Sequence, residues 1–77
     1  MIISYSKQSI KFLKKQDMIT RKRIIKSIEN LPLGDVKNLQ GVDNYRLRVG
    51  DYRIIYNQNG NVIRIERIDS RGQVYRR

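Results

Sequence analysis

The chain has 77 residues, enough for one small domain, and its 17 Lys and Arg against 7 Asp and Glu give a formal net charge of +10. It contains no Cys, His or Trp. Disulfides, a thiol nucleophile and a Ser-His-Asp triad are therefore excluded, and a zinc site would need carboxylates alone. We expect no metal and no small-molecule cofactor.

The positive charge favours an anionic partner, with nucleic acid first and an acidic protein or an anionic membrane surface as alternatives. No apolar run approaches the roughly 20 residues that would span a bilayer. The N-terminal residues also lack the apolar core of a signal peptide. We expect a cytoplasmic protein that does not act on a membrane.

The first half of the chain is predicted to contain a strand and two helices. Ser6 and Asp17 are suitable helix N-caps, and apolar residues after each recur at helical spacing. Pro32 is expected to end the second helix. In chain order, the predicted elements are a strand over residues 1–5, a helix over residues 7–15, a helix between residues 17 and 32, and a loop over residues 32–44.

From Tyr45 onward the apolar period changes from 3.6 to 2, which indicates β-strands. Gly50-Asp51 predicts a type II′ hairpin turn, and Asn59-Gly60 predicts a second hairpin. The predicted strands cover residues 45–49, 52–56 and 62–68, and a basic tail follows. The expected fold class is α+β: an N-terminal strand, a helical hairpin and a small, mostly antiparallel sheet (β-α-α-β-β-β) in a single domain over residues 1–77.

Pairing the first hairpin through its turn gives one face that we expect the helices to cover, with Tyr45, Leu47, Val49, Tyr52, Ile54 and Tyr56. The other face carries Arg46, Arg48 and Arg53, with Arg48 directly opposite Arg53. Like charges directly opposite each other are destabilising unless an anion lies between them, so this face is a candidate phosphate-binding surface. The alternative is a solvated basic face that binds nothing specific. Extension through Asn59-Gly60 places Glu66 opposite Arg53 and Arg64 opposite Ile55, although a bulge would shift this register.

Residues 45–56 (YRLRVGDYRIIY) and 70–76 (SRGQVYR) resemble the RelE/ParE toxin superfamily of bacterial toxin–antitoxin modules. The helical hairpin is also similar, so the resemblance covers nearly the whole chain. For RelE-type members it implies a ribosome-dependent endoribonuclease that cleaves mRNA by attack of the 2′-hydroxyl on the adjacent phosphate, without a metal. It also implies an acidic, RelB-like antitoxin as a partner, besides the ribosome and mRNA.

The resemblance places family site residues at Arg46, Arg48, Arg53, Arg71 and Tyr75, and we predict the individual roles from the chemistry and position of the basic and tyrosine side chains. The predicted catalytic residues are Arg48 and Arg53, which hold the phosphate, Arg71, which neutralises an oxygen, and Tyr75, which stacks on a base or moves a proton. The predicted RNA-binding residues are Arg46, Arg64, Arg76 and Arg77.

Two departures from the family pattern affect proton transfer. Ser70 stands where many relatives have His, and Arg46 and Arg48 stand where some relatives have Lys. Because arginine is a poor general base, the remaining candidates for proton transfer are Tyr75, Glu66 and Asp69.

Other functions remain open from the sequence. ParE-type members share the fold, inhibit DNA gyrase and cut no RNA. A plain nucleic-acid-binding module and an inactive relative of the nucleases are further alternatives.

Overall fold

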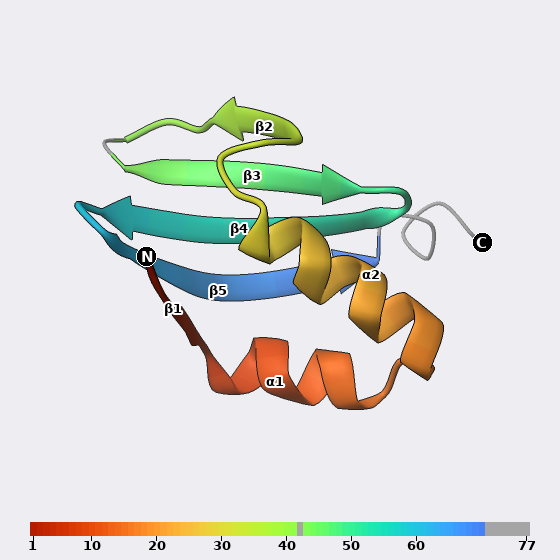
Figure 1. Cartoon of the computed structure of the whole chain (residues 1–77). Coiled ribbons are helices and arrows are strands. Elements are labelled where there is room, and N and C mark those ends of the chain that lie inside the picture. The colour runs from red at the N-terminus through yellow and green to blue at the C-terminus, as the bar shows by residue number, and fades with distance from the viewer. Residues whose placement is uncertain (42, 71–77) are drawn as a thin grey trace.

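The computed structural model describes residues 1–41 and 43–70. These form two helices and five strands, which confirms the predicted α+β class (Figure 1). No helix in this part of the chain is long and apolar enough to cross a membrane. In chain order the elements are β1 (Ile2–Tyr5), α1 (Lys7–Lys14), α2 (Met18–Glu29), β2 (Asp35–Asn38), β3 (Asn44–Val49), β4 (Tyr52–Asn59) and β5 (Val62–Ser70).

The five strands form one sheet in the order β1-β5-β4-β3-β2. β1 and β5 are parallel, and the other neighbours are antiparallel. Strand β2 corrects the prediction of a loop over residues 32–44, because Asp35–Asn38 pairs along β3. This strand has four residues and a single apolar side chain, Val36, so no alternation marks it in the sequence.

Both helices lie on the same side of the sheet (Figure 1). The predicted inward face of the first hairpin is confirmed, because Leu47, Ile54 and Tyr56 are almost completely buried beneath the helices. Tyr45 and Tyr52 are partly buried and pack against the same core. The fully buried apolar residues that α2 and β5 add are Ile24, Ile28, Ile63, Ile65 and Ile68.

Both predicted N-caps are present. The Ser6 Oγ accepts a hydrogen bond from the backbone N–H of Ser9, and the Asp17 carboxylate accepts one from the backbone N–H of Thr20 at 2.7 Å. This bond to Thr20 lowers the pKa of the Asp17 carboxyl below its usual value. The stabilisation from the Asp17 cap is therefore present above the carboxyl's unfolded-state pKa and is lost as the pH falls through the lower folded-state value.

The first hairpin turn is Gly50-Asp51, as predicted. Gly50 has a φ of +57°, whereas Asp51 does not have a positive φ, which is the type II′ pattern. The second turn is displaced by one residue from the prediction, since Asn59 still pairs with Val62 and the turn residues are Gly60 and Asn61. Gly60, with a φ of +60°, takes the first turn position, as Gly50 does in the first hairpin.

Strand β5 contains a bulge that changes which residues face β4. Ile55 pairs with Arg67 but Tyr56 pairs with Ile65, so Glu66 is an extra residue on β5. The bulge keeps Ile65 and Ile68 on the buried face although they are three residues apart.

Beyond the end of β1, the side chains of Ser6 and Gln8 form hydrogen bonds to the backbone of β5 in place of a neighbouring strand. The Ser6 Oγ donates to the carbonyl of Glu66 at 2.8 Å. The Gln8 amide bonds both backbone groups of Ile68: its Nε2 donates to the carbonyl, and its Oε1 accepts from the N–H, each at 3.0 Å. Gln8 thus satisfies the β5 edge that would otherwise lack a strand partner.

Replacing Gln8 with alanine is expected to lower the free energy of unfolding by about 1–2 kcal/mol, because two backbone groups of Ile68 lose their protein partners. Urea denaturation followed by circular dichroism measures this change. The control is Lys11→Ala, an exposed position on the same helix, for which we expect almost no change. Equal midpoints for the two variants would contradict the proposed role of Gln8.

Candidate anion-binding site on the open face of the sheet

The side of the sheet away from the helices is rich in arginine. We call this surface the arginine face. It is built by residues that alternate with the buried residues of β3, β4 and β5, namely Arg46, Arg48, Arg53, Arg64 and Arg67. Arg46, Arg48 and Arg53 share one face of the sheet, as the strand pairing of the first hairpin predicted.

One row of paired residues crosses the middle of the arginine face. Asp35 on β2 pairs with Arg48, Arg48 pairs with Arg53, and Arg53 pairs with Asp69 on β5. Two arginines therefore stand side by side with an aspartate at each end. The next row along the strands reads Lys37, Arg46, Ile55 and Arg67, so three more cations border the pair.

The two aspartates compensate part of this positive charge. Asp35 Oδ1 lies 3.3 Å from a terminal nitrogen of Arg46. Asp69 Oδ2 lies 3.7 Å from a terminal nitrogen of Arg53 and 2.8 Å from Arg67 Nε. These contacts explain how the like-charged Arg48–Arg53 pair is tolerated before any ligand binds. Among the described residues Arg48 makes no ion pair, so the centre of the row keeps uncompensated charge.

Two arginines of the face also keep unused hydrogen-bond donors. The Nε atoms of Arg46 and Arg48 are buried and have no acceptor within the described part of the chain. A buried polar group without a partner costs free energy, and a guanidinium is suited to bidentate contact with phosphate oxygens. The arrangement is therefore suited to holding an oxyanion over β3 and β4.

The pairing of β5 corrects two sequence predictions. Asp69 lies opposite Arg53 in place of Glu66, and Arg67 lies opposite Ile55 in place of Arg64. The later turn and the bulge together shift the register by three residues. Arg64 stays on the arginine face but pairs with Asn57.

Sequence reasoning missed Arg67 as a member of this face. The spacing of Ile63, Ile65 and Ile68 carries the missing signal, because all three can face the core only if an extra residue lies between the last two. The predicted site residues Arg71, Tyr75, Arg76 and Arg77 lie outside the described residues.

The described tyrosines closest to the core are poor candidates for proton transfer. Burial raises the pKa of Tyr56, with a smaller contribution from Tyr45, whose ring stacks on it at 5.3 Å. Burial and the nearby carboxylate of Glu29 raise the pKa of Tyr5. In the described part of the chain no group of three acidic side chains is arranged to hold a metal ion.

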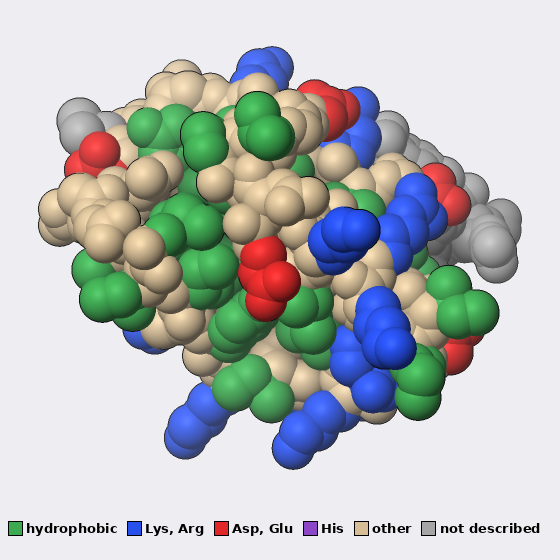
Figure 2. All heavy atoms as spheres, viewed as in Figure 1, with side chains coloured by type: hydrophobic (Ala, Val, Ile, Leu, Met, Phe, Trp, Pro, Cys, Tyr) green, Lys and Arg blue, Asp and Glu red, His purple; other side chains and the backbone are tan. Residues whose placement is uncertain are grey.

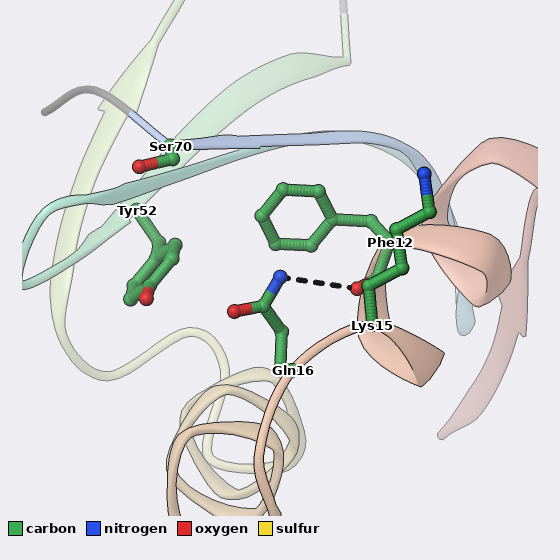
Figure 3. A pocket seen from close by; sticks show the side chains of 5 residues that line it. All are labelled: Phe12, Lys15, Gln16, Tyr52 and Ser70. Carbon is green, nitrogen blue, oxygen red and sulfur yellow. Dashed lines mark hydrogen bonds between the residues drawn. The ribbon is translucent and has the colours of Figure 1, made fainter. Parts of the chain in front are cut away.

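A cavity of about 500 Å³ lies on the other side of the sheet, between the end of α1 and the adjoining ends of β4 and β5 (Figure 3). Phe12 and Tyr52 meet edge to face at 6.0 Å, and the Gln16 amide donates to the Phe12 carbonyl. Among the described residues that line the cavity, Lys15 is the single charged one. On this helix side, basic side chains are interspersed with apolar ones (Figure 2). The arginine face is therefore the better candidate for phosphate chemistry.

Comparison with known proteins identifies the family. The model of the ParE toxin of type II toxin–antitoxin systems (parDE) matches residues 3–75. No curated protein gave a significant match. The chain belongs to this toxin family, within the RelE/ParE superfamily, as the sequence resemblance predicted.

Solved structures support the same assignment. The chain is 32% identical to one in the RelE–RelB complex from Pyrococcus horikoshii, with a TM-score of 0.79 and coverage of 94% of this chain and 96% of that one. It is 36% identical to a chain of the RelB–RelE antitoxin–toxin complex from Methanococcus jannaschii, with a TM-score of 0.72 and coverage of 94% of each. The fold is also shared by a chain of the RelBE2 complex from Mycobacterium tuberculosis, with a TM-score of 0.70. The two chains are 21% identical, and the match covers 91% of this chain and 96% of that one.

Proposed function

We propose that this toxin is a RelE-type endoribonuclease that cleaves mRNA on the ribosome and thereby inhibits translation. The observation that carries the proposal is the Arg48–Arg53 pair, two arginines directly opposite each other on the sheet face away from the helices. This arrangement is suited to a phosphate diester and to the additional negative charge that develops on it during the reaction.

In the proposed reaction the ribose 2′-oxygen attacks the adjacent phosphorus, and the bond from phosphorus to the 5′-oxygen breaks. The proton of the 2′-hydroxyl leaves, and a proton is delivered to the 5′-oxygen. The products are a 2′,3′-cyclic phosphate and a 5′-hydroxyl. In this proposal, orientation of the 2′-oxygen in line with the leaving oxygen supplies much of the rate enhancement. The proposed dependence on the ribosome would follow, because the ribosome would present the mRNA already bent.

The proposed roles combine the resemblance to the family with the chemistry of each side chain. Arg48 and Arg53 hold the scissile phosphate, Arg71 neutralises a non-bridging or leaving oxygen, and Tyr75 stacks on a base or transfers a proton. The proposed contacts to the rest of the RNA come from Arg46, Arg64, Arg76 and Arg77.

We also propose an acidic antitoxin as the partner that inhibits this toxin in the cytoplasm. The net charge of +10 favours a partner of opposite sign, and two solved relatives that are more than 30% identical to this chain come from complexes of RelE with RelB.

Inhibition of DNA gyrase is the second candidate function, and the match to the ParE family model favours it. One experiment separates the two. The toxin is expressed briefly, the 5′-hydroxyl ends of cellular RNA are mapped, and gyrase-linked DNA breaks are counted in the same cultures. We expect new 5′-hydroxyl ends inside coding regions without added DNA breaks. DNA breaks without new RNA ends would reject the nuclease in favour of the gyrase inhibitor.

A further inference from the structure

Asp69 contacts two arginines of the arginine face through one carboxylate oxygen. Its Oδ2 lies 2.8 Å from Arg67 Nε and 3.7 Å from the terminal nitrogen of Arg53. The Asp69 side chain is 22% exposed, whereas those of Arg53 and Arg67 are 45% and 66% exposed. Asp69 is therefore the most enclosed member of the three, and Arg53 is its more loosely held partner.

We propose that Asp69 is a built-in counter-ion that competes with RNA for Arg53, and that Arg67 retains Asp69 when a phosphate takes its place on Arg53. This inference rests on the proposed function, because it assumes that Arg53 binds phosphate. It assigns Asp69 and Arg67 a positioning and affinity-setting role rather than a chemical one.

The competition follows from the chemistry of the groups. Carboxylate and phosphate oxygens use the same donors of a guanidinium. The Arg53–Asp69 pair is long and partly exposed, so it is weak and a phosphate can displace it. The displaced carboxylate would then repel the phosphate beside it, unless another cation neutralises it.

Arg67 supplies that cation. Its contact with Asp69 is the shorter one, and its position opposite Ile55 places it in the next row, beside Arg53 but not in line with it. Asp69 therefore remains paired after Arg53 turns to the phosphate. The Asp69 carboxylate therefore lowers the affinity of the site for RNA that is not already held in position.

The first test measures binding of a fluorescein-labelled single-stranded RNA oligonucleotide by fluorescence anisotropy at constant salt concentration. Asp69→Asn is expected to bind about threefold more tightly than the natural chain. The control Glu29→Gln makes the same change of net charge at an exposed position of α2, on the other side of the sheet. We expect it to change the affinity by less than about 1.5-fold, because solvent and salt screen a distant exposed charge.

The second test removes the arginine that retains Asp69. Arg67→Ala is expected to weaken RNA binding about threefold more in the natural chain than in the Asp69→Asn variant, because only the natural chain has a carboxylate for Arg67 to retain. The control Arg64→Ala removes a charge from the same strand and face but makes no ion pair with Asp69, so it should weaken binding by the same factor with and without Asp69→Asn. The inference is overturned if Asp69→Asn binds no more tightly than Glu29→Gln, or if Arg67→Ala weakens binding by the same factor with and without Asp69→Asn.

Arg53→Ala distinguishes failure of this inference from failure of the proposed function. If Arg53→Ala binds the oligonucleotide as tightly as the natural chain, the phosphate contact itself is wrong, and the proposed function loses its basis in this residue. If Arg53→Ala weakens binding while Asp69→Asn has no effect, the counter-ion role alone is rejected. Circular dichroism of each variant shows that the fold is retained.

Discussion

Replacing Arg53 with alanine is expected to reduce ribosome-dependent mRNA cleavage by roughly 100- to 1,000-fold, the usual cost of removing one preorganised donor to a transition-state oxyanion. Arg48→Ala should have an effect of similar size, because the two residues are cross-strand partners and share the proposed phosphate. The measurement is single-turnover cleavage of a defined mRNA on programmed ribosomes with toxin in excess.

Two variants separate geometry from charge. Arg53→Lys keeps the positive charge but loses the planar fork of donors, so we expect an intermediate loss of about tenfold. Lys22→Ala removes one exposed charge from α2, on the other side of the sheet, and should leave cleavage nearly unchanged. Equal losses in Arg53→Ala and Lys22→Ala would indicate that general positive charge, and not a phosphate clamp, supports the activity.

Replacing Ile54 with alanine is expected to lower the free energy of unfolding by about 3 kcal/mol, because its completely buried side chain leaves a cavity between sheet and helices. A domain of this size has a total stability of only roughly 4–12 kcal/mol. The variant should therefore show a much lower urea midpoint and a substantial unfolded population near physiological temperature.

The neighbouring residue is the matched control for this prediction. Ile55 has the same side chain in the same strand but points to the open face and is only partly buried. Ile55→Ala should cost less than about 1.5 kcal/mol, since the removed atoms leave no enclosed cavity. A larger loss for Ile55→Ala than for Ile54→Ala would mean that the two faces of β4 are assigned the wrong way round.

The candidate site was predictable in part, because local rules determine which face of the sheet the arginines of β3 and β4 occupy. A two-residue turn after Val49 sets the partner of every residue in the hairpin, and the period of two then sends Arg46, Arg48 and Arg53 to one side. The contribution of β5 was not predictable in the same way. It depends on the position of the second turn, which sets every pair of that hairpin, and on the bulge at Glu66, which shifts the pairs beyond it, including Arg53 with Asp69.

By itself, the sequence determined the α+β class, both helix caps, the inward face of the first hairpin and the concentration of arginine on the outward face. These features depend on residues close together in the chain, where spacing alone selects the conformation. Only the tertiary structure decided that Asp35–Asn38 forms a strand, that β1 pairs with β5, and that Asp69 and Arg67 stand beside Arg53. These features arise from pairing between distant segments, which is selected by the burial of the core as a whole rather than by any local pattern.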